Sequence, residues 1–264
     1  MTSFEILAEQ SFRELLAILE WFSSFSYIPV LIGGWAVFVY NSYFGSVDID
    51  LVGPNMGGNF LDAVERYERT HGYEEFTSAG LGIEVAYRKP ITKENEFHGY
   101  VEIDVCTYEA DTGSFHEAAN TKLPYVLCDS EKHVQKVEFN AVATAYVPCK
   151  SLLFLYKLKA LRDRSFDLRT RGASMSRERR NWMQTKAEKD SADLIALLDP
   201  KPDRYMIKGD MDFDLLKHLL EDQKLHFALD TIKKLPTMKK ALDRHPGIEI
   251  ETVKEWVAAF FQRL

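Results

Sequence analysis

One stretch, from Leu31 to Leu51, constrains this chain more than any other. A short apolar run stops at the pair Gly33–Gly34, an apolar helical pattern begins directly after it, and the chain then returns as an alternating strand that carries Asp48 and Asp50. Side chains two residues apart on a strand share a face, so both carboxylates lie together. The stretch therefore predicts a strand, a glycine turn, a helix and an acidic strand in close succession.

The chemistry of this stretch favours a phosphate ligand and a divalent cation. Glycine has no Cβ, so a phosphate can approach the backbone at Gly33–Gly34. The first N–H groups of the following helix have no intrahelical partner and attract an anion. The like charges of Asp48 and Asp50 are costly unless a cation such as Mg²⁺ neutralises them. A solvated strand face beside an ordinary turn is the alternative, but apolar residues alternate with these acids and favour function.

The sequence patterns divide the chain near Pro148. Residues 1–147 predict helices at 4–21, 35–43 and 59–71 and strands near 27–32, 47–52, 73–76, 82–88, 100–108, 136–139 and 142–147. Residues 148–264 carry helical periods at 151–162, 186–198, 213–220, 225–235 and 252–264. We therefore predict an α+β protein with two domains. The first, 1–147, has a mixed sheet with helices, and the second, 148–264, is an all-α helical domain.

Charge changes at the same boundary. Residues 1–147 hold 9 Lys and Arg against 22 Asp and Glu, a net charge of −13, whereas residues 148–264 hold 24 against 18, a net charge of +6. The total of −7 argues against a generally basic nucleic-acid coat protein, but the helical half is basic. Its excess is concentrated in an Arg-rich segment that contains Arg162, Arg164, Arg169, Arg171, Arg177, Arg179 and Arg180.

Two interpretations of the Arg-rich segment remain open. It is either a mobile, solvated loop or a surface that contacts RNA or another polyanion, because guanidinium groups bind phosphate. Phe166 and Trp182 supply rings on which bases can stack.

Composition and motifs exclude several other classes. With 46% hydrophobic residues, 28% charged residues, 14 Gly and 9 Pro, the chain is neither disordered nor collagen-like. Three cysteines without a CxxC pair indicate neither a disulfide framework nor a zinc ribbon, and no Gly-x-Ser-x-Gly elbow supports a hydrolase. The most apolar stretch, 27–40, is too short to span a bilayer. We expect a cytoplasmic protein without a signal peptide or a membrane partner.

The glycine pair and the acidic strand together resemble the signature of the polymerase-β-type nucleotidyltransferase superfamily. Gly33, Gly34, Asp48 and Asp50 match its pattern of apolar-Gly-Gly, about a dozen residues, and Asp-apolar-Asp-apolar. The resemblance implies a nucleotidyltransferase fold, a glycine turn that contacts the phosphates of an NTP substrate, and an acidic pair that binds Mg²⁺ or Mn²⁺. It also implies a third carboxylate from a later strand.

The stretch 100–108 offers two candidates for that third carboxylate. Asp104 is the candidate we place in the metal site with the acidic pair. Glu102 lies on the same strand face by parity and is the alternative.

The second half resembles AbiEii-type nucleotidyltransferases over 151–164 and 189–198. That pattern has a Lys on the helix that enters the helical domain, then an Arg, then Lys-Asp-x-x-Asp-Leu. The matching positions here are Lys157 (with Lys159 as the alternative), Arg164, Lys189, Asp190 and Asp193. The catalytic residues we expect are Asp48, Asp50, Asp104, Lys157 and Asp190. The nucleotide-binding residues we expect are Gly33, Gly34, Ser46, Lys157 and Lys189.

The residues themselves also permit simpler roles, and two positions depart from the pattern. Lys157 can extend from a packed helix face without binding a ligand, and Lys189 with Asp193 can form an i,i+4 ion pair. Members of the superfamily often carry an Arg four residues before the first Asp, where this chain has Phe44. The Arg-rich segment, about 165–185, is an addition to the pattern.

The sequence thus predicts a metal-dependent nucleotidyltransferase that moves NMP from an NTP to an acceptor hydroxyl of RNA or protein. The AbiEii-type group includes toxins of toxin–antitoxin systems, so the resemblance also implies a toxin role and an antitoxin partner. One alternative is a binding protein with a degenerate nucleotidyltransferase fold and no turnover. Another is a small-molecule enzyme like those that adenylylate aminoglycosides, which would need an acidic acceptor pocket.

Overall fold

The computed structural model describes residues 2–25, 27–54, 58–78, 83–110 and 113–264, without the side chains of 83–85. Gly82, the first residue of one predicted strand, lies outside these ranges. The chain forms two compact units, each assembled from three separate stretches. Unit one comprises Met1–Ala36, Gly45–Ala110 and Tyr125–Pro148, and unit two comprises Val37–Phe44, Asp111–Pro124 and Cys149–Leu264.

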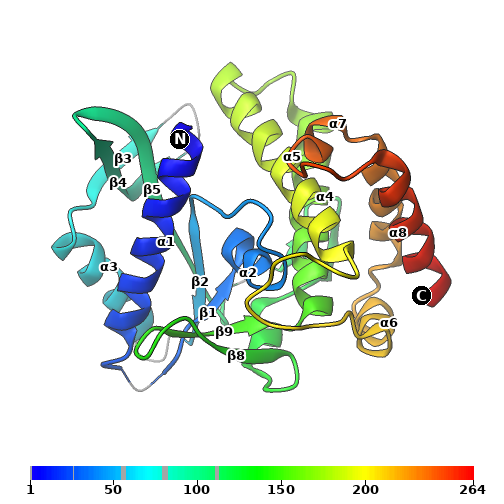
Figure 1. The fold of residues 1–264 in the computed structure, drawn as a ribbon, viewed down its shortest axis with the longest axis horizontal. Coiled ribbons are helices and arrows are strands. Elements are labelled where there is room, and N and C mark those ends of the chain that lie inside the picture. The colour runs from blue at the N-terminus through cyan, green and yellow to red at the C-terminus, as the bar shows by residue number, and fades with distance from the viewer. Residues whose placement is uncertain (1, 26, 55–57, 79–82, 111–112) are drawn as a thin grey trace. The chain divides into compact units, whose positions relative to one another are not determined.

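A mixed seven-stranded sheet forms the centre of unit one (Figure 1). Its strands lie in the order β3 (Glu74–Ser78), β4 (Ile83–Lys93), β5 (Glu96–Thr107), β2 (Ile49–Gly53), β1 (Val30–Ile32), β9 (Thr144–Pro148) and β8 (Val134–Glu138). The pairs β2–β5 and β1–β9 are parallel, and the other neighbouring pairs are antiparallel. The predicted α+β class, a mixed sheet with helices followed by a helical region, is confirmed.

Helices α1 (Ser3–Phe22) and α3 (Asn59–Thr70) pack in unit one because each has one apolar face. A capping box between Thr2 and Glu5 starts α1, and its buried face includes Leu15 and Ile18. The two helices are tied together where Nε1 of Trp21 donates a hydrogen bond to the backbone oxygen of Ala63 (3.2 Å). The central strand β1 is apolar and buried throughout, as its short apolar run predicts.

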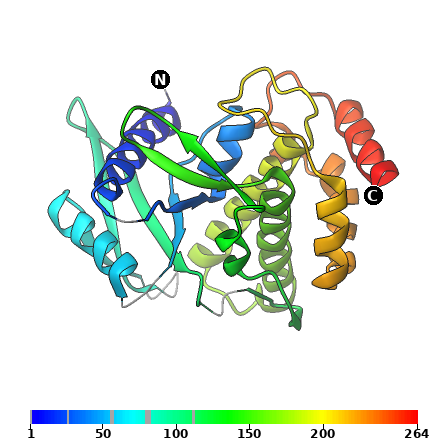
Figure 2. The same ribbon diagram turned by 90° about the horizontal axis from the view of Figure 1, so that it is seen from below.

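Helices dominate unit two. The long helices α4 (Lys150–Arg171) and α5 (Arg177–Leu198) run side by side (Figures 1 and 2). They are followed by α6 (Phe213–Asp222), the 3-10 helix η3 (His226–Thr237), α7 (Lys239–Leu242) and α8 (Ile250–Arg263). No helix in the described part of the chain combines the length and apolar character needed to cross a membrane.

The Arg-rich segment is helical, so its interpretation as a loop is wrong. Only Gly172–Ser176 forms a turn between α4 and α5. Helix α4 continues past its predicted end at 162, and α5 begins before its predicted start at 186. The last turn of α4 contains an i,i+4 ion pair between Asp167 and Arg171 (3.7 Å). Ser176 caps α5 by accepting a hydrogen bond from the backbone N–H of Arg179 (3.1 Å).

Two short stretches from the first half of the chain belong to unit two. The end of α2 (Gly33–Tyr40) leads to Asn41, whose side-chain amide donates to the backbone oxygen of Ala196 (3.0 Å). The hairpin of β6 (Ser114–Phe115) and β7 (Ala118–Lys122) packs Phe115 against Phe227, with ring centroids 5.2 Å apart. The sequence does not reveal these contacts because their partners are distant along the chain.

Candidate active site

Gly33 makes room for a carboxylate at the start of α2. It follows β1 directly and adopts the left-handed backbone conformation, with φ of +68°. Asp50 lies opposite Ile32 in the antiparallel β1–β2 register, and a Cβ at Gly33 would overlap the Oδ2 atom of Asp50. Any other residue at this position would therefore displace the carboxylate.

A second carboxylate lies beside Asp50 in the sheet. The parallel register of β2 and β5 pairs Asp50 with Asp104, which places both side chains on one face. Burial, together with the negative charges of Asp104 and Asp50, raises the pKa of the nearby Cys106 thiol to about 11. Asp48 is half-buried and comes one residue before β2 begins. The structure therefore brings Asp50 and Asp104 together, with Asp48 just ahead of the same strand.

The strand register also separates the two candidates for the third carboxylate. Glu102 lies opposite Arg88 in the β4–β5 pair, whereas Asp104 lies beside Asp50. The guanidinium group of Arg88 is held between the rings of Phe76 and Tyr100, at 3.8 and 3.7 Å from their centroids. Of the two acids, Asp104 is thus the one placed next to the acidic pair.

This donor set fits a hard divalent cation. Carboxylate oxygens are the ligands that Mg²⁺ and Mn²⁺ prefer. Over the residues that the structure describes, no three His, Cys, Asp or Glu side chains form a ready-made metal cluster. Mg²⁺ commonly binds through one or two carboxylates and completes its shell with substrate phosphates and water. The carboxylates of Asp48, Asp50 and Asp104 beside the glycine turn suit a cation of that kind.

The other residues predicted to bind nucleotide in unit one are buried. Gly34 is the second residue of α2 and lies beneath the surface, next to the half-buried Gly33. Ser46 is only 2% exposed and precedes Asp48 by two residues. The N–H groups of the first turn of α2 have no partner within the helix itself.

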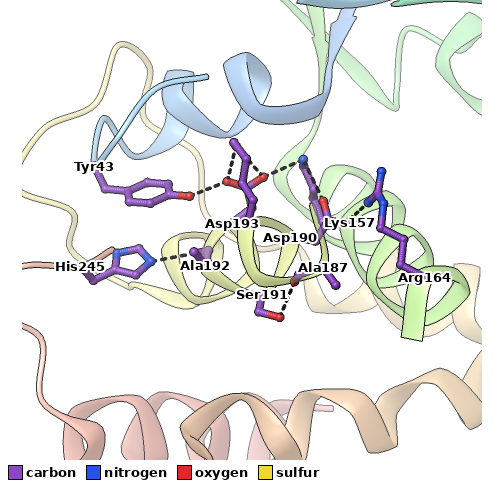
Figure 3. Close-up of polar contacts among 10 residues, drawn as sticks. Tyr43, Lys157, Arg164, Ala187, Asp190, Ser191, Ala192, Asp193 and His245 are labelled. Carbon is purple, nitrogen blue, oxygen red and sulfur yellow. Dashed lines mark hydrogen bonds and ion pairs between the residues drawn. The ribbon is translucent and has the colours of Figure 1, made fainter. Parts of the chain in front are cut away.

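The predicted residues of the second half form a buried charge network inside unit two (Figure 3). The carboxylate of Asp193 is fully buried and lies 2.7 Å from Nζ of Lys157 and 3.1 Å from Nζ of Lys189. Burial by itself raises the pKa of Asp193, but the two ammonium groups outweigh it and hold that pKa below its usual value. The expected i,i+4 pair of Lys189 and Asp193 is present.

Asp190 of α5 extends this network to Arg164 of α4. Its Oδ1 atom lies 3.5 Å from Nζ of Lys157, and its Oδ2 atom pairs with the guanidinium group of Arg164. Lys159, the alternative to Lys157, instead pairs with Asp163 (2.5 Å). The structure therefore brings Lys157, and not Lys159, to the Lys-Asp-x-x-Asp motif.

Two members of the network are absent from the sequence motifs. The hydroxyl of Tyr43 donates a 2.5 Å hydrogen bond to Oδ1 of Asp193, and burial with that carboxylate raises the Tyr43 pKa well above its usual value. The Tyr43 ring stacks on His245 with centroids 4.2 Å apart. His245 in turn contacts the backbone oxygen of Ala192 through Nε2 (2.9 Å). No local pattern links residues so far apart in sequence.

A solved structure resembles this chain over most of its length. It is the crystal structure of an antigenic nucleotidyltransferase-like protein from Paracoccidioides brasiliensis. The TM-score is 0.47 and the identity is 14%, and the alignment covers 94% of this chain and 98% of that one. No protein-family model and no curated protein matches the chain. Its function therefore has to be inferred from its own residues.

Proposed function

We propose that this chain is a metal-dependent nucleotidyltransferase that moves NMP from an NTP to an acceptor hydroxyl. The observation that carries the proposal is the fit between Gly33 and Asp50. The absent Cβ lets a carboxylate lie against the start of a helix, so a cation held by this carboxylate would be next to donors for phosphate. Asp104, in register with Asp50, adds a further oxygen donor.

The reaction exchanges a phosphoanhydride bond of the NTP for a phosphoester bond to the acceptor. The turn at Gly33–Gly34 and the first N–H groups of α2 would orient the triphosphate, and Asp48, Asp50 and Asp104 would hold the cation. When bound, the cation stabilises negative charge on the phosphates and lowers the pKa of the attacking hydroxyl. The acceptor oxygen forms a bond to the α-phosphorus, the bond to the leaving group breaks, and pyrophosphate departs.

Lys157, Lys189 and Asp190 keep the roles that the resemblance implies, as part of the proposal. Lys157 and Lys189 would contact phosphate, and Asp190 would orient the acceptor hydroxyl or take its proton. Both lysines already bind Asp193, so their removal also affects stability. Lys157→Arg keeps the charge but changes its geometry. We expect this variant to raise KM for the NTP and to leave the melting temperature nearly unchanged.

The test is transfer of label from each α-labelled NTP, with Mg²⁺, to total RNA or to candidate proteins. We expect label in the wild type and none with Asp48→Ala plus Asp50→Ala. The matched control is Glu74→Ala plus Glu75→Ala, which removes two exposed carboxylates from β3 of the same sheet. Equal labelling by the wild type and the Asp48/Asp50 variant would contradict the proposal. Nucleotide-dependent thermal stabilisation without pyrophosphate release would support the non-catalytic binding protein instead.

The surface of α5 favours RNA as the acceptor class. Arg179, Trp182 and Lys186 follow one another at i, i+3 and i+7, which places them along one helix face. Trp182 is 42% exposed, and Nζ of Lys186 lies 5.7 Å from its ring centroid. An aromatic side chain between two cations is suited to stack on a base while its neighbours bind the flanking phosphates.

The first turn of α5 carries three arginines and one carboxylate, Glu178, so its net charge is positive. Among the residues that the structure describes, no carboxylate forms an ion pair with Arg177, Arg179 or Arg180. Cations at a helix N-terminus are unfavourable for the helix dipole, so this turn concentrates positive potential. A polyanionic acceptor matches that potential better than the cationic aminoglycosides of the small-molecule alternative.

Filter binding of a single-stranded RNA oligomer over a KCl series tests this acceptor class. We expect Arg179→Ala plus Lys186→Ala to reduce the slope of log K against log salt by about 1 to 2, and Trp182→Ala to weaken binding about tenfold or more. Lys224→Ala plus Lys254→Ala is the control, because it removes the same number of charges elsewhere in unit two. Equal losses in both double variants would leave the α5 surface without a specific role.

A toxin role with an antitoxin partner, in the cytoplasm, completes the proposal. It rests on the AbiEii-type resemblance of the Lys157 and Lys189–Asp190 positions. Induced expression in a bacterial host should arrest growth with the wild type but not with Asp48→Ala plus Asp50→Ala. Equal growth of the two cultures would argue against this role while leaving nucleotidyl transfer itself open to the labelling test.

A further inference from the structure

A cavity of about 410 Å³ lies within unit two, outside the residues discussed so far. The end of α2, the start of α4 and the segment 200–210 form its walls. The side chains that give it its chemistry are Tyr40, Lys150, Lys201, Tyr205, Lys208 and Asp210, and we call it the Lys150 pocket. Its volume is within the range of pockets that bind small molecules.

The walls of the Lys150 pocket are fixed by backbone contacts. The N–H groups of Met206 and Ile207 donate to the backbone oxygen of Val39 (2.8 and 3.2 Å). Gly209 lies so close to the ring of Tyr40 that a Cβ there would overlap it. These contacts hold the segment 200–210 against the end of α2, so the pocket is formed before any ligand arrives.

Lys150 gives the pocket a buried positive charge. It is only 7% exposed, and burial lowers its pKa. Its ammonium group donates one hydrogen bond within the described structure, to the backbone oxygen of Asp199 (3.2 Å), although it carries three donors. It is also the first residue of α4, where the helix dipole disfavours a cation and favours an anion. A buried anion would relieve both penalties.

The remaining lining residues select the kind of anion. Lys201 and Lys208 are exposed at the rim, and Asp210 is the carboxylate of the lining, so three ammonium groups face one negative charge. The nearby Asp199 reduces this excess without cancelling it. Tyr40 and Tyr205 supply flat apolar walls that suit a planar ring.

We propose that the Lys150 pocket binds a small phosphate monoester that carries a planar ring, of the nucleoside monophosphate class. The phosphate would be held by Lys150 and the rim lysines, and the ring would lie against the tyrosines. This site shares no residue with the carboxylate site of unit one, so it is a second ligand site and does not depend on nucleotidyl transfer.

Isothermal titration calorimetry in EDTA tests the proposal, because without a divalent cation the carboxylates of unit one do not attract phosphate. The probes are the four nucleoside monophosphates, adenosine and inorganic phosphate. We expect at least one monophosphate to bind with Kd below about 1 mM, and adenosine and phosphate to bind at least tenfold more weakly.

Variants locate the binding. Lys201→Ala plus Lys208→Ala, at exposed positions, should weaken it by about tenfold or more, since it removes two of the three ammonium groups proposed to hold the phosphate. Lys224→Ala plus Lys254→Ala should bind like the wild type, and so should Asp48→Ala plus Asp50→Ala. No binding by any monophosphate, or binding that the Lys201/Lys208 variant leaves unchanged, would overturn the proposal.

Discussion

At the scale of single residues, the absence of one methyl group at Gly33 decides where a carboxylate can lie. Two separate constraints act there, the positive φ and the close approach of Asp50. Gly72 has only the first constraint, because its φ is +80° and a Cβ added there would meet no atom within 4 Å. Comparing the same substitution at Gly33 and Gly72 therefore separates the effect of the close approach of Asp50 from the effect of backbone strain.

Gly33→Ala should abolish nucleotidyl transfer and destabilise the protein more than Gly72→Ala. The Gly72 variant should lose about 1 kcal/mol of unfolding free energy, the usual cost of a left-handed non-glycine residue, and keep its activity. Urea unfolding and the labelling assay provide the two measurements. Equal stability and activity in both variants would show that the approach of Asp50 is unimportant.

Glu68 shows how burial in unit one changes proton binding. This residue of α3 is 6% exposed, and burial, with the charges of Glu65 and Asp104, raises its pKa to about 7. The unfolded chain binds that proton with a pKa near 4.5. Between these values the folded state holds more protons than the unfolded state, so the protein becomes less stable as pH rises.

Glu68→Gln should remove this pH dependence. In EDTA, the wild type should lose up to about 3 kcal/mol of unfolding free energy between pH 4.5 and pH 7, with no further loss from this group above pH 7. The variant should show a flatter profile and exceed the wild type in stability at pH 8. Glu74→Gln, at an exposed position of β3, serves as the control. A wild-type profile that stays as flat as that of Glu68→Gln would refute the assignment.

At the scale of elements, α4 and α5 differ in how well their end charges suit the helix dipole. Arg169 and Arg171 lie in the last turn of α4, where cations are favourable, whereas Arg177, Arg179 and Arg180 lie in the first turn of α5, where they are not. Local stability does not explain the second set. The polyanion binding that we propose would favour them, so substitutions in the two turns should differ in their effects on stability and on RNA binding.

Arg→Glu substitutions in the first turn of α5 and in the last turn of α4 should change stability in opposite directions. Arg177→Glu should stabilise the protein by about 0.3 to 1 kcal/mol while weakening RNA binding. Arg171→Glu should destabilise it by a similar amount, because it removes a favourable cation and its pair with Asp167. Thermal denaturation measures both shifts, and shifts of the same sign would contradict this explanation of the α5 turn.

The ends of these two helices also show the limits of sequence patterns. The periodic apolar residues predict helices at 151–162 and 186–198, and both lie inside the observed α4 and α5. Between them the sequence is polar and loses its period, so nothing local distinguishes a loop from an exposed pair of helix ends. Packing of the two helices against each other supplies the missing stabilisation.

At the scale of the whole molecule, unit two is completed by two stretches from the first half of the chain. Unit two needs Tyr43 to bond the buried Asp193 and Asn41 to bond the backbone of Ala196. It also takes the hairpin at 113–124, where Tyr156 of α4 donates to the backbone oxygen of Pro124 (3.0 Å). A cut at the change of composition near residue 148 would therefore remove parts of the helical unit.

A fragment that spans 149–264 should not unfold cooperatively at the melting temperature of the intact chain. Without Tyr43 and Phe115, Asp193 loses a buried hydrogen bond and Phe227 loses its ring partner. Circular dichroism in the far and near ultraviolet would show helix without fixed aromatic packing. A cooperative transition at the temperature of the intact chain would show that the earlier segments are dispensable.

The sequence by itself determined the α+β class, most of the helices and strands, and the order of the glycine turn and the acidic strand. It could do so because these features depend on the alternation of apolar and polar residues over short distances. Only the tertiary structure decided that Asp104 lies beside Asp50, that Lys157 and not Lys159 meets Asp190, and that Tyr43 completes the network. These pairings join residues far apart in sequence, and they follow from strand register and helix packing, which no local pattern specifies.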